Sequence, residues 1–150
     1  MISKKTKYAL KALQILAEDY NRREPILISH LAKTGHIPKK FLELILLELK
    51  NNGILQSKKG KGGGYLLAKS PDKISLGAIL RILEGALAPL PCLSRSAYRK
   101  CEECEDESTC AIRLVMKNLH ETTVQILDGT TLKNLIEQAH STQEVLMYAI

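Results

Sequence analysis

The stretch that decides the fold runs from residue 28 to residue 68, ISHLAKTGHIPKKFLELILLELKNNGILQSKKGKGGGYLLA. A short helical piece with Ser29 as its N-cap is expected to break at Gly35. Pro38 suits the first position of a second helix, where its missing N–H is not needed. That helix has apolar residues at helical spacing and ends before Gly53, a natural left-handed residue after a helix. Helix, glycine turn and second helix together predict a helix-turn-helix.

A hairpin with a basic tip is expected directly after this unit. The β-prone runs 54–57 and 65–68 flank the loop KKGKGGG at 58–64, which cannot pack a core of its own. A basic hairpin behind a helix-turn-helix is a wing, so the stretch predicts a winged helix that binds duplex DNA. The loop glycines would let the backbone approach sugar and phosphate, and its lysines would lie in the negative minor groove. The glycine spacing fits neither a dinucleotide loop nor a Walker loop.

The candidate DNA contacts come from the second helix and the wing. The N-terminal residues of a recognition helix meet base edges in the major groove. There lysine can donate to guanine or phosphate, and glutamate can accept from the cytosine amino group. Phe41 and Leu42 are expected to hold this helix to the core. The complete candidate set is Lys39, Lys40, Glu43, Lys58, Lys59, Lys61, Gly62 and Gly63.

Composition and charge are those of a small globular protein that binds a polyanion. The 150 residues allow one domain, or one domain with an appendage, with 45% hydrophobic and 25% charged residues. Residues 1–75 hold 15 Lys and Arg against 6 Asp and Glu, whereas residues 76–150 hold 7 against 10. The basic half is the footprint expected of a nucleic-acid binder, although an ordinary solvated lysine face is the alternative. With no secretion signal and no apolar run of about 20 residues, the protein is expected to be cytoplasmic.

Two further helices frame the predicted winged domain. Ser3 can cap a helix that runs to about Tyr20, and Ser75 can cap one that ends at Gly85. Residues 86–91, with two prolines, are expected to be a linker. The fold class is therefore mostly α with a small β-hairpin, and residues 1–85 form the winged helix-turn-helix domain.

All four cysteines of the chain lie in one segment, CLSRSAYRKCEECEDESTC at 92–110. The segment has no apolar face, so something other than burial must order it, and a metal centre is a good candidate. Four thiolates suit zinc and an iron–sulfur cluster alike. Redox-active thiols are a third interpretation, weakened because the acidic neighbours should raise the thiol pKa values. The candidate ligands are Cys92, Cys101, Cys104 and Cys110.

The rest of the chain is expected to form a long helix and a last helix. The long helix should run from about Ser108 to Leu127, and its apolar positions step by three and four residues, as in a helix–helix seam: Ile112, Val115, Leu119, Thr122 and Ile126. Pairing with the same helix of a second subunit would cover this stripe, with packing on its own domain as the alternative. Thr131 should cap the last helix, which packs back through Leu132, Leu135, Ile136 and Ala139. The predicted division is thus 1–85, a cysteine loop at 86–110, and helices at 111–150; the sequence does not place the last ten residues.

The chain resembles the Rrf-type family of bacterial winged-helix regulators, whose branches include IscR, NsrR and CymR. The resemblance rests on Lys7-Tyr8-Ala9, Ile37-Pro38-x-x-Phe41-Leu42-Glu43, Asn52-Gly53 and Gly60-x-Gly62-Gly63-Gly64-Tyr65-Leu66-Leu67. It implies a homodimer, joined by the long helix, on a palindromic operator. It also implies that Glu43 faces the major groove and Lys59 the minor groove.

The same resemblance implies an iron–sulfur cluster on three loop cysteines, matched here by Cys92, Cys104 and Cys110. The interval from Cys92 to Cys104 is longer than is usual in the family, and Cys101 is an added thiol. Arg113 and Tyr8 stand where other branches supply a fourth ligand, so Cys101 is the candidate for that role. A [2Fe–2S] cluster ranks first, then [4Fe–4S], then zinc or a bare redox switch.

The sequence as a whole predicts a homodimeric transcription regulator that senses iron–sulfur, redox or nitric oxide status. The alternative is a small metal or cluster carrier protein without sequence-specific DNA binding. An enzyme is not expected, because no Ser/His/Asp set and no paired carboxylates in an apolar setting are present.

Overall fold

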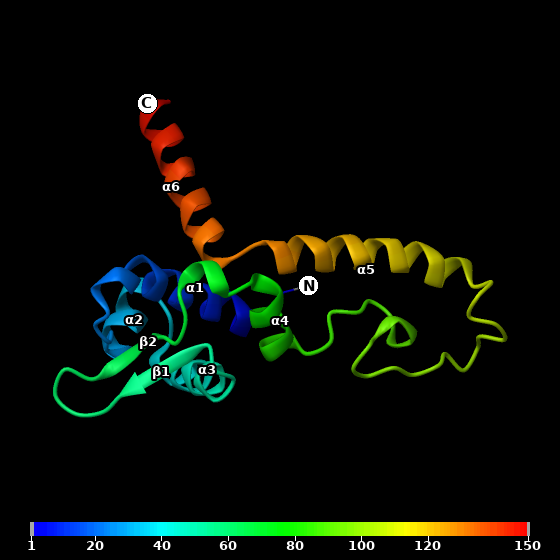
Figure 1. Cartoon of the computed structure of the whole chain (residues 1–150), viewed down its shortest axis with the longest axis horizontal. Helices are drawn as coiled ribbons and strands as arrows, with labels where there is room; N and C mark the ends of the chain where they lie inside the picture. Colours follow the sequence, from blue (N-terminus) through cyan, green and yellow to red (C-terminus); the bar gives the residue numbers. More distant parts are fainter. Residues whose placement is uncertain (1, 150) are drawn as a thin grey trace.

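Six α-helices, three short 3-10 helices and one hairpin are found in this computed structural model, which describes residues 2–149. The elements are α1 (Lys4–Glu18), η1 (Tyr20–Arg22), α2 (Ile28–Gly35), α3 (Lys39–Asn51), β1 (Leu55–Lys58), β2 (Gly64–Leu67), η2 (Pro71–Lys73), α4 (Leu76–Glu84), η3 (Pro91–Leu93), α5 (Ala111–Gly129) and α6 (Leu132–Tyr148). Figure 1 shows α1 to α4 and the hairpin forming a body from which α5 and α6 project. The predicted mostly α fold with a small hairpin is confirmed. Within residues 2–149, no helix has the length and apolar character to cross a membrane.

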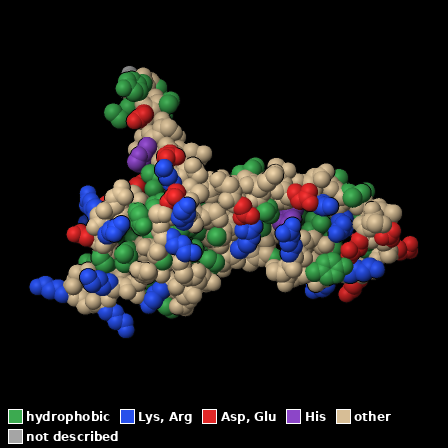
Figure 2. Space-filling model, viewed as in Figure 1, with side chains coloured by type: hydrophobic (Ala, Val, Ile, Leu, Met, Phe, Trp, Pro, Cys, Tyr) green, Lys and Arg blue, Asp and Glu red, His purple; other side chains and the backbone are tan. Residues whose placement is uncertain are grey.

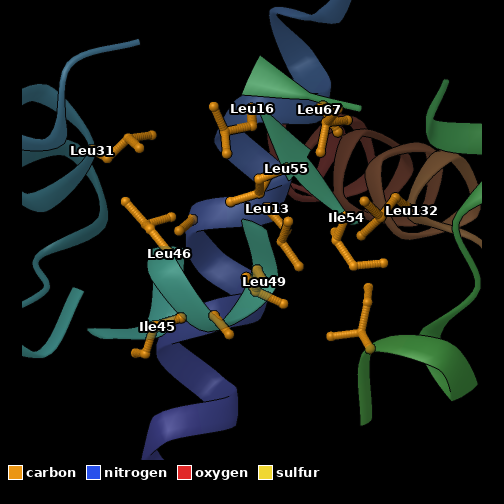
Figure 3. Packing of buried hydrophobic residues seen from close by; sticks show 14 of the residues in the cluster. Leu13, Leu16, Leu31, Ile45, Leu46, Leu49, Ile54, Leu55, Leu67 and Leu132 are labelled. Atoms are coloured by element: carbon orange, nitrogen blue, oxygen red, sulfur yellow. The ribbon is translucent and has the colours of Figure 1, made fainter. Parts of the chain in front are cut away.

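The core lies where α1, α2, α3 and the hairpin meet (Figure 3). Leu13 of α1, Leu31 of α2 and Leu46 of α3 are completely buried there. Leu132 of α6 is also completely buried and belongs to the same cluster. The first turns of α6 therefore pack back on the winged body, and α6 contacts α1.

The helix-turn-helix differs in detail from the sequence-based expectation. The N-cap of α2 is Leu27, so Ser29 lies inside the helix and caps nothing. The left-handed residue after α2 is His36 (φ 51°), whereas Gly35 is buried, and a Cβ on it would lie 2.8 Å from Ile37 Cδ1. Gly35 thus serves close packing and not the turn. Pro38 is the N-cap of α3 and not its first helical residue, and Gly53 (φ 73°) follows the helix as predicted.

The hairpin is antiparallel and begins one residue away from each predicted run. Leu55 pairs with Leu67 and Lys58 pairs with Gly64. A short third segment supports it, because Ile26 and Tyr65 exchange N–H···O bonds of 2.8 and 2.9 Å. These bonds anchor the wing to the chain that leads into α2.

Side-chain caps fix the remaining helices. Ser3 accepts from Thr6 N at 3.2 Å, and Ser75 accepts from Ala78 N at 3.2 Å, as predicted. Thr131 accepts from Asn134 N and forms a capping box with it. The N-caps of α4 and α6 lie side by side, because Ser75 and Thr131 form an antiparallel backbone bridge. The helical start of α6 is therefore fixed to the body.

The start of α1 also receives a carboxylate from α4. The Ser3 backbone N–H donates to Glu84 Oε1 at 2.8 Å. Hydrogen bonds from Ser3 and Thr6 lower the pKa of Glu84 to about 2. The lysines of this first turn place positive charge at the positive end of the helix dipole, which is unfavourable. The negative charge of Glu84 at the same end offsets part of that cost.

The base of α5 is joined to α4 by a bidentate ion pair. Arg81 Nη1 and Nη2 donate to Asp128 Oδ1 and Oδ2 at 2.6 and 2.9 Å. These bonds lower the pKa of Asp128. A bidentate pair of this kind stabilises the fold more than an ordinary surface ion pair. Solvent still weakens it, because both side chains are more than two-fifths exposed.

Replacing Asp128 with Asn is expected to lower the free energy of unfolding by about 1 kcal/mol at neutral pH, the upper end for exposed pairs. The folded-state pKa of Asp128 is lowered, so the pair contributes fully above the unfolded pKa of about 4. That contribution is lost as the pH falls through the folded-state pKa. Urea unfolding should therefore show the difference between Asp128→Asn and the parent shrinking between neutral pH and about pH 2.

Glu121→Gln is the matched control, because Glu121 meets Lys117 only as an exposed single contact of 3.8 Å. It should change stability much less than Asp128→Asn at neutral pH. If the loss of unfolding free energy in Asp128→Asn stayed the same at acidic pH, an electrostatic origin of the stabilisation would be contradicted.

Candidate nucleic-acid interface and cysteine loop

Helix α3 and the hairpin lie together along one edge of the body (Figure 1), and α3 contacts β1 directly. This follows from the sequence, because Gly53 ends α3 and Ile54 N–H donates to Leu49 O at 2.9 Å, which turns the chain straight into β1. The wing tip is the segment 58–64. Figure 2 shows lysine and arginine side chains projecting at this end of the molecule.

The charged candidate residues on α3 and the wing are all exposed: Lys39, Lys40, Glu43, Lys58, Lys59 and Lys61. None of them forms an ion pair with a described residue. No side chain caps the start of α3. The structure therefore brings together free ammonium groups and uncapped helix amides, a combination suited to phosphate oxygens.

The wing glycines have two different structural reasons. Gly60 and Gly62 adopt φ of 90° and 76°, which only glycine takes easily, and a Cβ there would meet open space. Gly63 is buried, and a Cβ on it would collide with the Lys58 carbonyl oxygen. Gly64 abuts Ile26 O in the same way. Gly63 and Gly64 thus have a reason within the wing itself, which is close packing against its own backbone, besides the predicted approach to DNA.

The exposed face of α3 also carries large apolar side chains. Leu42 is completely buried, as predicted, but Phe41 is 59% exposed. The expectation that Phe41 holds α3 to the core is wrong. Leu44 and Leu47 are 68% and 47% exposed and were missed by the sequence analysis. The signal for them was present, since α3 is apolar on more faces than one core contact requires.

The lysines at the start of α1 do not all remain free. Lys5 Nζ lies 2.5 Å from Glu48 Oε2 of α3. Lys4 and Lys7 are exposed. Lys5 therefore joins α1 to α3, and Lys4 and Lys7 stay available to an anion.

The cysteine loop lies at the outer end of α5, away from the wing (Figure 1). Its order comes from polar contacts near the start of α5: Tyr98 Oη donates to Glu107 Oε1 at 2.7 Å, and Ser108 N–H and Oγ donate to Asp106. Cys110 is the N-cap of α5, so the helix starts three residues later than predicted. Pro91, expected in the linker, begins η3.

The four thiols are only partly gathered. Burial raises the pKa of the Cys104 thiol, and the nearby Cys110 raises it further. Cys92 is buried, and Cys101 is exposed and donates to Glu103 Oε2 at 2.9 Å, which raises its pKa. Within residues 2–149 no three His, Cys, Asp or Glu side chains are arranged to hold a metal ion. As the loop lies here, the donor set suits a cluster by its chemistry but not by its geometry.

Helix α5 has one face on the body and one in solvent. It contacts α4 and η3. On another face of α5, four apolar residues are between 57% and 66% exposed, and we call them the outer stripe: Ile112, Val115, Leu119 and Ile126. The tip of α6 is equally bare, since Val145, Leu146, Met147 and Tyr148 are all at least 60% exposed.

The chain has close counterparts among known proteins over most of its length. A family model named Rrf2, described as an iron-dependent transcriptional regulator, matches residues 2–138. The chain belongs to the Rrf2 family. An rrf2-like protein of Rhodobacter capsulatus is 40% identical over 148 residues, which are 97% of this chain and 99% of that protein. The transcriptional regulator NsrR of Geobacillus kaustophilus is 30% identical over 94% of this chain and 92% of that protein.

A solved Rrf2-family structure agrees with the fold over nearly its whole length. CymR, the global cysteine regulator of Bacillus subtilis, superposes with a TM-score of 0.76 and 30% identity, covering 92% of this chain and 97% of that chain. Family membership identifies the protein as a DNA-binding transcription regulator and not an enzyme. The comparisons therefore favour the regulator over the carrier protein that the sequence left as an alternative.

Proposed function

We propose that the protein is a cytoplasmic homodimer that binds a palindromic operator with α3 and the wing, and that its cysteine loop holds an iron–sulfur cluster that reports iron–sulfur, redox or nitric oxide status. In this proposal Lys39, Lys40 and Glu43 face the major groove. Lys58, Lys59, Lys61 and Gly62 approach the minor groove and its phosphates. In this proposal residues 1–85 bind DNA, residues 86–110 hold the sensing cluster, and residues 111–150 form the dimer interface.

The observation that carries the DNA-binding part is the set of unpaired lysines on α3 and the wing. Five exposed lysines, all without an acidic partner among the described residues, gather on two adjacent elements: Lys39, Lys40, Lys58, Lys59 and Lys61. Residues 1–75 as a whole carry 15 basic against 6 acidic residues. Such a face gains free energy from displacing the counterions that surround duplex DNA.

Replacing Lys59 with Ala is expected to weaken binding to promoter duplex by on the order of tenfold, because each subunit loses one phosphate or minor-groove contact. The slope of log affinity against log salt should also become shallower by about two, one for each wing of the dimer. Fluorescence anisotropy over a series of salt concentrations measures both quantities.

Lys133→Ala is the matched control, because Lys133 is an exposed lysine on α6, paired only loosely with Glu137 at 3.9 Å. It removes the same charge from a different part of the molecule and should leave affinity and slope unchanged. Equal effects of the two substitutions would remove the wing from the proposed contact.

The support for a homodimer is the outer stripe of α5. Four large apolar side chains on one face of a projecting helix expose a patch that monomeric proteins rarely leave uncovered. Their steps of three and four residues suit a second helix of the same kind. A two-fold pairing through α5 would also supply two reading heads for a palindromic operator.

The support for an iron–sulfur cluster is the donor set together with the family's description as iron-dependent. Four thiols lie within 19 residues, and Cys110 is near enough to Cys104 to raise its pKa. Cys92, Cys104 and Cys110 would hold the cluster, with Cys101 as the proposed fourth ligand. A bound cluster would supply a reversible chemical change that responds to iron, oxidants or nitric oxide. The loop must close further than it does here to bring these thiols together.

A further inference from the structure

The solvent face of α3 is more apolar than the fold requires. The side chains that join α3 to the core are Leu42, Ile45, Leu46 and Leu49, each no more than 1% exposed. Phe41 and Leu44 add nothing to that contact, since they are 59% and 68% exposed. Leu44 lies one helical turn after Lys40, so the apolar and cationic side chains share one face.

The surroundings of Phe41 and Leu44 favour nucleic acid as the molecule that covers them. Lys39, Lys40 and Lys50 on the same helix are exposed, and the hairpin beside α3 carries the exposed wing lysines. A second copy of this chain seated on α3 would bring these lysines against one another. Duplex DNA instead offers complementary charge.

Few apolar groups are available to such side chains in the major groove. Base edges there present hydrogen-bond donors and acceptors, with the C5-methyl group of thymine as the apolar exception. Resting on our proposed function, we propose that Phe41 and Leu44 contact thymine methyl groups, so that operators carry thymine where the first two turns of α3 meet the bases. These two side chains are then specificity-determining residues, although neither can form a hydrogen bond through its side chain.

The chemistry also explains what such residues would reject. Leucine and phenylalanine cannot pair with the amino group of cytosine or adenine, and covering that group without a hydrogen bond is unfavourable. A thymine methyl removes this conflict and buries apolar surface on both sides. Glu43, on the neighbouring part of the face, remains free to accept from a cytosine amino group. The helix would thus combine one polar and two apolar contacts.

The test removes only the methyl groups. A duplex of about 30 base pairs, three helical turns, is enriched from a random-sequence pool by binding to the full chain. It is then synthesised with thymine or with uracil at each position, because uracil lacks the methyl but keeps every hydrogen-bonding group. Binding should weaken by about fourfold for each contacted methyl that is lost, the factor expected for burying one CH₂-sized group.

Variants of the protein are measured on the same thymine and uracil duplexes, which gives a double-mutant cycle between side chain and methyl group. Leu44→Ala and Phe41→Ala should bind the thymine duplex more weakly than the parent and should lose part of the preference for thymine over uracil. Leu146→Ala is the matched control, since Leu146 is 60% exposed on α6 and lies outside α3. It should keep the full preference. Circular dichroism and thermal unfolding check that each variant folds.

The outcomes separate this inference from the function on which it rests. If no duplex is enriched, DNA binding itself fails. If the parent binds thymine and uracil duplexes equally, or if Leu44→Ala and Phe41→Ala both keep the full preference, DNA binding stands and the methyl contact is overturned.

Discussion

A charge placed in the outer stripe of α5 by Leu119→Glu is expected to turn the proposed dimer into a monomer and to weaken operator binding by about a hundredfold or more. Leu119 is 57% exposed in the single chain, so the substitution should leave the subunit folded. In a two-fold pairing, each introduced carboxylate would be buried near its own copy without a cationic partner, which is strongly unfavourable. A monomer also loses the effective concentration, of the order of millimolar, that links its two reading heads. Analytical ultracentrifugation and anisotropy measure the two effects.

Gln125→Glu provides the control for Leu119→Glu. It introduces the same charge into α5, about 120° around the helix from Leu119 at 3.6 residues per turn. Gln125 is exposed and lies outside the outer stripe. This variant should remain dimeric and bind DNA as the parent does. A Leu119→Glu protein that sediments as a dimer would contradict pairing through the outer stripe.

Replacing Cys104 with Ala is expected to abolish bound iron and sulfide and the visible absorption of the anaerobically purified protein. Cys104 is half-buried beside Cys110, and a cluster that loses one of its thiolate ligands is generally lost. Cys101→Ala should have the same effect if the added thiol is the fourth ligand. Metal analysis and absorption spectra before and after iron reconstitution measure these changes.

Ser96→Ala is the control for the cysteine variants, because Ser96 is an exposed residue of the same loop without a thiol. It should retain iron like the parent. A parent protein that stays colourless and iron-free after anaerobic reconstitution would contradict the cluster proposal, while leaving the DNA-binding part intact.

The sequence predicted the fold well where local chemistry and periodicity act alone. Ser3, Ser75 and Thr131 cap their helices as expected, and Gly53 takes the left-handed conformation. The start of α2 was misplaced because it depends on a tertiary contact. The pairing of Ile26 with Tyr65 fixes the chain just before α2, and this favours Leu27 over Ser29 as the N-cap.

The sequence proposed the residues of the candidate site, but it did not predict their contacts in the fold. An apolar residue on α3 predicts burial, yet α3 packs on one side only, so Phe41 remains exposed. The cysteine loop is held by a hydrogen bond between Tyr98 and Glu107, which have no periodic relation in the sequence. The ion pair of Lys5 with Glu48 has no signal in the sequence, because it depends on how α1 crosses α3.

The most direct test of the account is selection of bound sequences from a random pool of duplex DNA by the purified protein. A dimer that reads DNA with α3 and the wing should enrich a two-fold symmetric sequence, with half-sites separated by about one helical turn of 10 base pairs or a multiple of it. A pool that remains random, or that yields a single site without symmetry, would contradict the account.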